Sequence, residues 1–187
     1  MNNYFIQQGF FVNDPSCMEW DSFTISSWYK DEEKAKEIKL EYLNAYLNAS
    51  KDIQKALYAR THINPGMTAY RNDQTCVPFL FSCRHLIELT IKYKLEELNI
   101  NYSPNHKIKN LWKKLVTGIK EYNPRFDELI ETLNYTDKEG FGLRYPYNNK
   151  KRLFDKGPVS IHSKRIMEAT EELYKFIMSL KKGYYEL

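Results

Sequence analysis

The chain has 187 residues, of which 42% are hydrophobic and 15% aromatic, and it carries a net charge of +4. This composition predicts a single folded domain and excludes a disordered chain, and the low count of seven glycines and seven prolines argues against a turn-rich all-β fold. The mean hydropathy is −0.65 and no apolar run approaches the ~20 residues of a membrane span, so no membrane association is expected.

Residues 1–30 are rich in aromatic side chains and lack a regular apolar period. So much apolar surface is unfavourable in water, so we expect this segment to pack across the rest of the protein or to form a short hairpin. Burial in a protein partner is the alternative. The sequence therefore predicts an irregular N-terminal segment over residues 1–30 and a single helical domain over residues 31–187.

Five later stretches have the three- and four-residue apolar spacing of amphipathic helices. Proline stands at the expected start of several of them, where its missing N–H costs little. The pattern predicts an all-α bundle of four to five helices. The expected helices cover roughly residues 31–60, 77–98, 107–122, 124–133 and 158–181.

The helix expected over residues 77–98 carries a narrow polar arc on an otherwise apolar surface. On a helix that turns about 100° per residue, Arg84, His85, Glu88 and Lys92 fall within an arc of roughly 100°. One interpretation is an ion-pair lock, in which Arg84 and Glu88 pair with each other and with Lys92 on a partly solvated face. The other is a functional site.

His106 stands just before the helix expected over residues 107–122. It is either a capping-region histidine that fixes the loop, bonded to Glu88, or a base or phosphate contact near Arg84. Metal-free RNA cleavage needs a base for the 2′-hydroxyl and a cation for the phosphorane charge. Arg84 with His85 or His106 could supply both groups, so these three are the candidate catalytic residues.

The segment from residue 137 to 157 is basic and aromatic. Between Lys138 and Lys156 it holds six basic residues and only two acids. Aromatic rings can stack on bases while cations hold phosphates, which makes Arg144, Tyr145 and Lys150 candidate substrate-binding residues together with Glu88 and Lys92. The alternatives are a solvated loop and a loop whose aromatic residues dock on the bundle.

The three cysteines and four histidines lack the spacing of a disulfide framework or a metal site. We therefore expect no metal and no cofactor. The N-terminus has neither a basic region nor a small-residue cleavage site, so no secretory signal is predicted and a cytoplasmic protein is expected.

The pattern Arg84-His85-x-x-Glu88-Leu89-x-x-Lys92 on an apolar helix resembles the HEPN helical-domain superfamily. The later His106-x-Ile108-x-x-Leu111-Trp112 pattern resembles the same superfamily. The Arg144-Tyr145-Pro146 sequence is similar to uncharacterised bacterial members with abortive-infection-like contexts. The resemblance covers about residues 77–180. It implies an up-and-down helical bundle, often a homodimer, and a role in toxin–antitoxin or phage-defence systems.

Many members of that superfamily are metal-independent RNases that use an Arg-x(4–6)-His motif at a dimer cleft. This sequence departs from the pattern, because no arginine in it is followed by histidine at that distance. Two hypotheses follow. The protein binds RNA or a nucleotide, with metal-independent RNase activity at a composite site, or it is a non-catalytic interaction module that holds a protein partner through its aromatic N-terminal segment.

Overall fold

The computed structural model describes residues 35–62, 75–103, 105–117, 119, 122–138, 140, 143 and 162–181. The chain divides into two compact units, residues 1–38 and 39–187, and only the start of one helix is described in the first unit. The predicted N-terminal segment over residues 1–30 lies outside the described residues.

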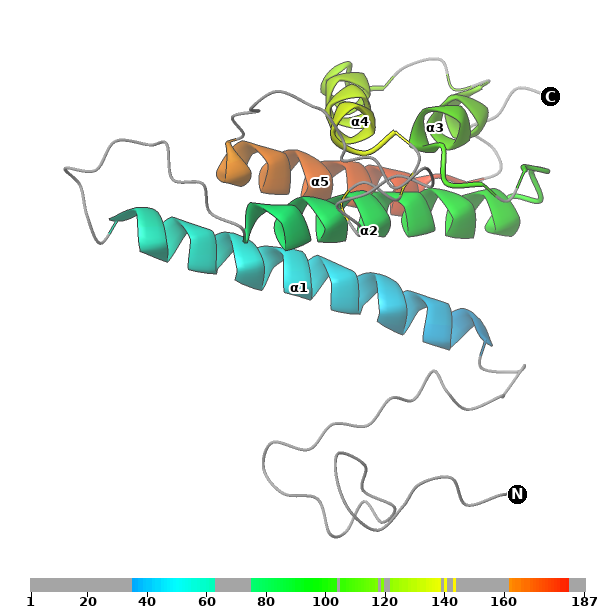
Figure 1. Cartoon of the computed structure of the whole chain (residues 1–187). Coiled ribbons are helices and arrows are strands. Elements are labelled where there is room, and N and C mark those ends of the chain that lie inside the picture. Colours follow the sequence, from blue (N-terminus) through cyan, green and yellow to red (C-terminus); the bar gives the residue numbers. More distant parts are fainter. Residues whose placement is uncertain are drawn as a thin grey trace, which may run out of the picture. The chain divides into compact units, whose positions relative to one another are not determined.

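All regular structure in the described part of the chain is helical, which confirms the predicted all-α bundle (Figure 1). Among those residues, no helix has both the length and the apolar character that crossing a membrane requires. The five helices are α1 (Ala35–His62), α2 (Cys76–Glu97), α3 (Ile108–Val116), α4 (Arg125–Thr136) and α5 (Ser163–Ser179).

The third helix is shorter than the expected range of residues 107–122. It ends at Val116, and Thr117 already has extended backbone angles of φ −60° and ψ 119°. Two β-branched residues followed by Gly118 weaken the helix at this point, and the apolar spacing that continues to Ile119 does not compensate. Ile119 instead donates its backbone N–H to the carbonyl of Val116 at 3.0 Å.

Helix α2 is the centre of the bundle and packs against α3, α4 and α5. Figure 1 shows α3 and α4 on one side of the α2–α5 pair and α1 on the other. The apolar positions of α2 are buried because they face neighbours over most of the helix circumference. Its fully buried core residues are Phe79, Cys83, Leu86, Ile87, Ile91 and Leu95.

Helices α2 and α5 run in the same direction. The Nζ atom of Lys94, near the end of α2, donates to the carbonyls of Met178 and Leu180 at the end of α5, both at 3.1 Å. Helix α1 runs the opposite way, since Lys39 near its start pairs with Glu96 at the end of α2 at 2.6 Å. The short α3 and α4 connect the two parallel helices.

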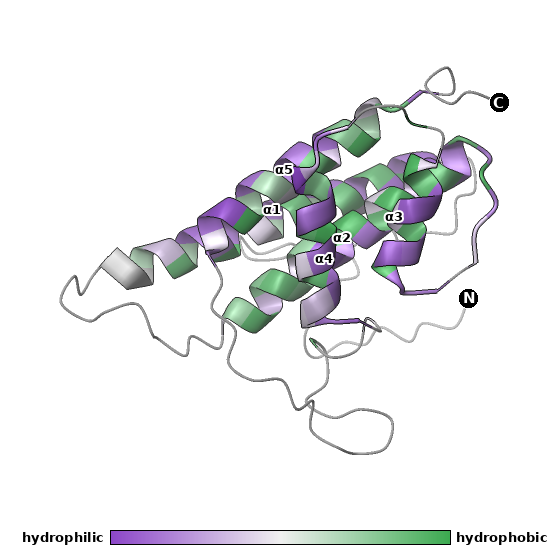
Figure 2. Ribbon diagram, turned by 90° about the horizontal axis from the view of Figure 1, so that it is seen from above, coloured by the Kyte–Doolittle hydropathy of each residue, from purple (hydrophilic) through white to green (hydrophobic). Residues whose placement is uncertain are grey.

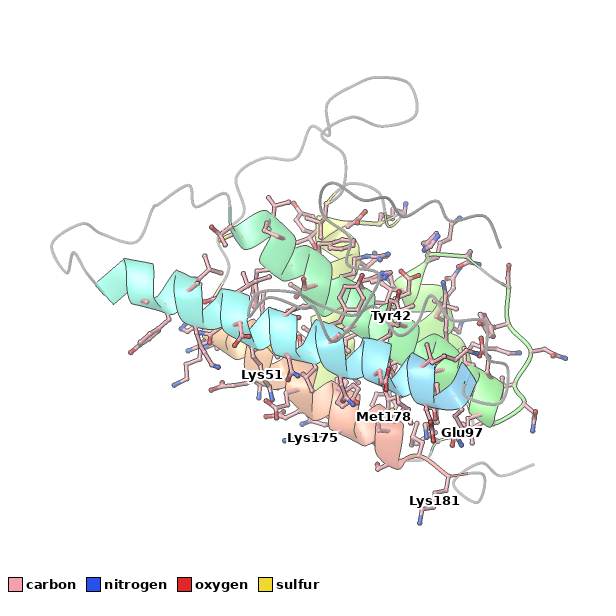
Figure 3. All side chains as sticks on the ribbon, turned by 90° about the horizontal axis from the view of Figure 1, so that it is seen from below. Tyr42, Lys51, Glu97, Lys175, Met178 and Lys181 are labelled. Atoms are coloured by element: carbon pink, nitrogen blue, oxygen red, sulfur yellow. The ribbon has the colours of Figure 1, made fainter. Side chains whose placement is uncertain are left out.

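Side-chain contacts join α1 to α5. Glu171 of α5 pairs with Lys51 of α1 at 3.2 Å and with Lys175 of its own helix at 2.9 Å, and Figure 3 labels both lysines on this side of the bundle. These contacts are partly exposed, so each contributes little to stability. Leu43 and Leu57 of α1 are buried and anchor this helix to the body.

Candidate functional site

A buried carboxylate on α2 organises the polar arc that the sequence shows. Glu88 is completely buried, and its Oε1 atom lies 2.7 Å from Nζ of Lys92 and 2.7 Å from Nδ1 of His106. Its other oxygen, Oε2, accepts a hydrogen bond from Nη1 of Arg84 at 2.8 Å. The predicted contact between His106 and Glu88 is thus present, and Arg84, Glu88, Lys92 and His106 form one cluster.

Arg84 connects three segments that are distant in sequence. Besides Glu88, its guanidinium donates from Nε to the carbonyl of Asp137 at 2.9 Å and from Nη2 to the carbonyl of His106 at 2.6 Å. The side chain is only 2% exposed. The ion pair of Arg84 and Glu88, which was expected on a partly solvated face, is therefore buried.

The cations around Glu88 keep it ionised. Burial alone raises the pKa of the Glu88 carboxyl, but hydrogen bonds and charge from Lys92, with hydrogen bonds from His106 and Arg84, outweigh burial and lower the pKa to about 2. A carboxylate that is ionised at neutral pH can hold two cationic or donor groups in fixed positions.

The cluster has a buried interior and a solvent-facing edge. The side chain of His106 is 41% exposed and that of Lys92 is 17% exposed, whereas Arg84 and Glu88 are sealed beneath them. Since both exposed groups lie 2.7 Å from the same carboxylate oxygen, the imidazole and the ammonium are close neighbours at the surface. This edge can meet an anionic ligand.

The segment after α4 closes over the cluster. Gly140 has a φ of +78°, and a Cβ at this position would lie 2.7 Å from Cβ of His106 and 3.3 Å from Nη2 of Arg84. Only glycine combines this backbone conformation with such a close approach. The buried Asp137 side chain accepts the backbone N–H of Leu143 at 3.4 Å, which fixes the start of the predicted basic loop.

His85 is separated from the other members of the polar arc. Its ring lies 5.3 Å from the ring of Phe81 in a stacked arrangement and 4.7 Å from the ring of Tyr46 in an edge arrangement. Tyr46 belongs to α1, so His85 contributes to the contact between α1 and α2. The structure therefore places one of the two candidate histidines in the cluster and the other in a helix interface.

A comparison with protein families bears on this arrangement. The model of the HEPN domain matches residues 77–183, which is more than half of the chain. The chain belongs to the HEPN domain family. Comparisons with curated proteins and with solved structures find no significant match. The HEPN domain begins at the first turn of α2 and includes α3, α4, α5 and the whole Glu88 cluster.

Three predicted substrate-binding residues of the HEPN domain, Arg144, Tyr145 and Lys150, lie outside the described residues. Among the residues that are described, no three His, Cys, Asp or Glu side chains come together in a way that could hold a metal ion. The role of the basic loop stays a prediction, because Arg144, Tyr145 and Lys150 are not among the described residues.

Sequence reasoning missed Asp137 and Gly140. The backbone carbonyl of Asp137 accepts a hydrogen bond from Arg84, and its side chain holds the chain at Leu143. Neither role leaves a helical or strand period in the sequence. The only local signal is a glycine three residues after an aspartate at a helix end, which is common in turns.

Proposed function

We propose that this HEPN protein binds RNA or a nucleotide at the edge formed by His106 and Lys92. One observation supports the proposal above the others: a single buried oxygen of Glu88 holds both groups, at 2.7 Å each, while both remain accessible to solvent. A cation next to an oriented imidazole matches the chemistry of a phosphate and its neighbouring hydroxyl.

The buried residues of the cluster act as positioning residues. Glu88 accepts from Nδ1 of His106 and so fixes the orientation of the ring, as carboxylates commonly do for functional histidines. Arg84 fixes Glu88 and the backbone carbonyl of His106 at the same time. Because Arg84 is sealed, its contribution in this proposal is indirect, through the geometry of His106.

The start of the basic loop supports further contacts to the same ligand. Gly140 packs on His106, and the backbone N–H of Leu143 donates to Asp137, whose carbonyl binds Arg84. Leu143 therefore lies close to the cluster. Arg144 is the next residue in the sequence. In this proposal Arg144, Tyr145 and Lys150 add phosphate and base contacts next to His106.

Metal-independent cleavage is a further step that this site could support. His106 would accept the proton of a ribose 2′-hydroxyl, and the 2′-oxygen would attack the adjacent phosphorus. The bond from phosphorus to the 5′-oxygen would break, and the leaving 5′-oxygen would take a proton from water at this solvent-facing edge. Lys92 would stabilise the charge on the phosphorane. The products are a 2′,3′-cyclic phosphate and a 5′-hydroxyl. This composite site would stand in for the absent Arg-x(4–6)-His motif.

The test compares binding and cleavage of a labelled 20-nucleotide single-stranded RNA by the wild type, Lys92→Gln and His106→Gln, all in EDTA. We expect the wild type to bind with an affinity that falls as salt rises, and Lys92→Gln to weaken binding by about three- to tenfold. Lys55→Gln is the matched control, because Lys55 is exposed on α1 and pairs only locally with Asp52.

Loss of cleavage in His106→Gln with binding retained would support the RNase step. Binding without cleavage in the wild type would restrict the function to recognition. Absence of binding at low salt would contradict the proposal and favour the second candidate.

The second candidate is a non-catalytic interaction module. The burial of Arg84 favours it, because a sealed guanidinium is typical of a structural ion pair. In this proposal the aromatic segment over residues 1–30 holds a protein partner, and the family resemblance places the protein in a defence or toxin–antitoxin-type system. Such a protein would be inert toward RNA in the experiment above.

A further inference from the structure

The short helix α3 has a strongly asymmetric distribution of charge. Between Leu98 and Lys120 the sequence holds five lysines and no aspartate or glutamate. Four of them, Lys107, Lys109, Lys113 and Lys114, lie on α3 or directly before it, and all four are exposed. This region is separate from the basic loop over residues 137–157.

The four lysines share one side of the helix. At about 100° per residue they fall, together with Asn110, within an arc of roughly 160°. The buried residues Ile108, Leu111, Trp112 and Leu115 occupy the opposite arc, against α2 and α4. Figure 2 shows the same alternation, with hydrophilic and hydrophobic ribbon side by side along α3. We call the side formed by Lys107, Lys109, Lys113 and Lys114 the lysine face.

The lysine face is poorly neutralised compared with other lysines of the bundle. Lys55, Lys164 and Lys175 on α1 and α5 each have a carboxylate within 4.0 Å. On α3 only Lys109 has one, from Glu131 of α4. Within the described residues, no ion pair involves Lys107, Lys113 or Lys114. Three positive charges along the lysine face are therefore available to attract an external anion.

An exposed aromatic residue lies on α4, the helix next to the lysine face. Glu131, which pairs with Lys109, is one turn before Tyr135 on the same side of α4, and Tyr135 is 59% exposed. α3 and α4 are direct neighbours. Cations next to an exposed ring are the combination that binds a single strand, whose phosphates meet the cations and whose unstacked bases meet the ring.

We propose that the lysine face binds the backbone of a single-stranded RNA that continues from the His106–Lys92 edge, with Tyr135 as a stacking surface for one base. The inference rests on the proposed function and narrows its ligand from RNA or nucleotide to an RNA strand. Lys107 directly follows His106, so the two surfaces are continuous along the chain. From Lys107 to Lys114 the helix rises about 10 Å, more than one phosphate can span.

The experiment measures binding of the labelled 20-nucleotide RNA by the full-length protein over a range of salt concentrations. The test variant carries Lys107→Gln, Lys113→Gln and Lys114→Gln. The control variant carries Lys55→Gln, Lys164→Gln and Lys175→Gln, which removes the same charge from exposed lysines of α1 and α5. Circular dichroism and thermal unfolding establish that both variants are folded.

For single strands, each neutralised phosphate contributes about 0.7 to the slope of log K against log salt. Removing three contacts should therefore lower the slope by about 2 and weaken binding about tenfold at low salt, and the control should stay close to the wild type. Tyr135→Ala should weaken binding without changing the slope. Adenosine monophosphate should not compete with the strand at concentrations well above that of the protein.

Other outcomes would overturn the inference in distinguishable ways. Equal losses in both triple variants would show that binding follows net charge alone. Unchanged binding in the α3 variant, with a loss in Lys92→Gln, would overturn the lysine face and leave the proposed site standing. Full competition by adenosine monophosphate would restrict the ligand to a nucleotide, and no binding by the wild type would overturn both proposals.

Discussion

The side chain of Arg84 donates hydrogen bonds to three groups. One is the carboxylate of Glu88, one helical turn along α2, and the others are the backbone carbonyls of His106 and Asp137, which are 22 and 53 residues away in the sequence. Each bond satisfies a group that folding removes from water, namely two backbone carbonyls and a carboxylate. An arginine suits this position because its planar guanidinium has donors in fixed directions. At the scale of the residue, the cluster is a buried support beneath two accessible groups.

The low pKa of Glu88 predicts a dependence of stability on acid. Its pKa falls from the ordinary 4.5 to about 2 in the folded protein, so its ionised form stabilises the fold above pH 4.5. That contribution, about 3 kcal/mol, should disappear as the pH falls from about 4.5 to 2. Urea unfolding of the wild type at a series of pH values measures it.

The matched variant is Glu88→Gln, which keeps the shape but cannot ionise. We expect it to be less stable than the wild type by about 2–3 kcal/mol at pH 7, because Arg84 and Lys92 lose their common counter-charge. The difference between the two proteins should shrink toward pH 2. Parallel stability curves from pH 7 to pH 2 would contradict the assignment.

The residues of this cluster differ in how far the sequence predicts them. Helical spacing alone brings Arg84, Glu88 and Lys92 together, and the contact from His106 was one of its two expected roles. Burial of Arg84 was not predictable, since it depends on Asp137 and Gly140, which are 53 and 56 residues after it in the sequence. Separation of His85 from its neighbour Arg84 depends on where α1 packs, which the polar arc does not encode.

At the scale of the helix, Lys94 shows how α2 fixes the end of α5. Its side chain is only 4% exposed and its Nζ atom bonds to Glu97 at 2.6 Å and to two carbonyls of the last turn of α5. A cation at a helix C-terminus is favourable because it meets the negative end of the helix dipole. Sequence reasoning treats lysine as a surface residue, so this role was not predicted.

Lys94→Met should lower the free energy of unfolding by about 2 kcal/mol, because the carbonyls of Met178 and Leu180 lose their donor while the apolar shape of the stem is retained. Hydrogen exchange should show faster opening at the C-terminal turn of α5. Lys114→Met on the exposed side of α3 is the control and should change stability by less than about 0.5 kcal/mol. Equal effects from both substitutions would show that Lys94 has no special role.

The ends of the helices follow from local residues more than from apolar spacing. Ile119 continues the apolar period of α3, yet the helix stops at Val116, where Thr117 turns to an extended conformation. His162 begins α5 by accepting the backbone N–H of Arg165 through its Nδ1 atom at 3.4 Å. The period predicts that a helix exists, and capping and backbone preferences decide where it ends.

At the scale of the whole molecule, the HEPN domain over residues 77–183 includes α2 to α5, and the long helix α1 precedes it in the sequence. The parallel course of α2 and α5 could not be derived from the sequence, because helical periodicity carries no direction. It follows from the two short helices α3 and α4, which connect α2 to α5. They bring the chain from the end of α2 back to the end of the bundle where α2 begins, and α5 begins there.

The family resemblance also predicts a homodimer, which light scattering on the full-length chain can test. One chain has a mass of 22.4 kDa, so a dimer should scatter as about twice that mass across the micromolar range.

A dimer would carry two His106–Lys92 edges and two lysine faces. One long RNA could then engage both copies, and binding of the second would become intramolecular. The affinity for a 40-nucleotide strand should therefore exceed that for two separate 20-nucleotide strands by more than the statistical factor of about two, and the excess should vanish when dilution produces monomers. A mass of one chain at every concentration would contradict the dimer and confine RNA binding to a single copy.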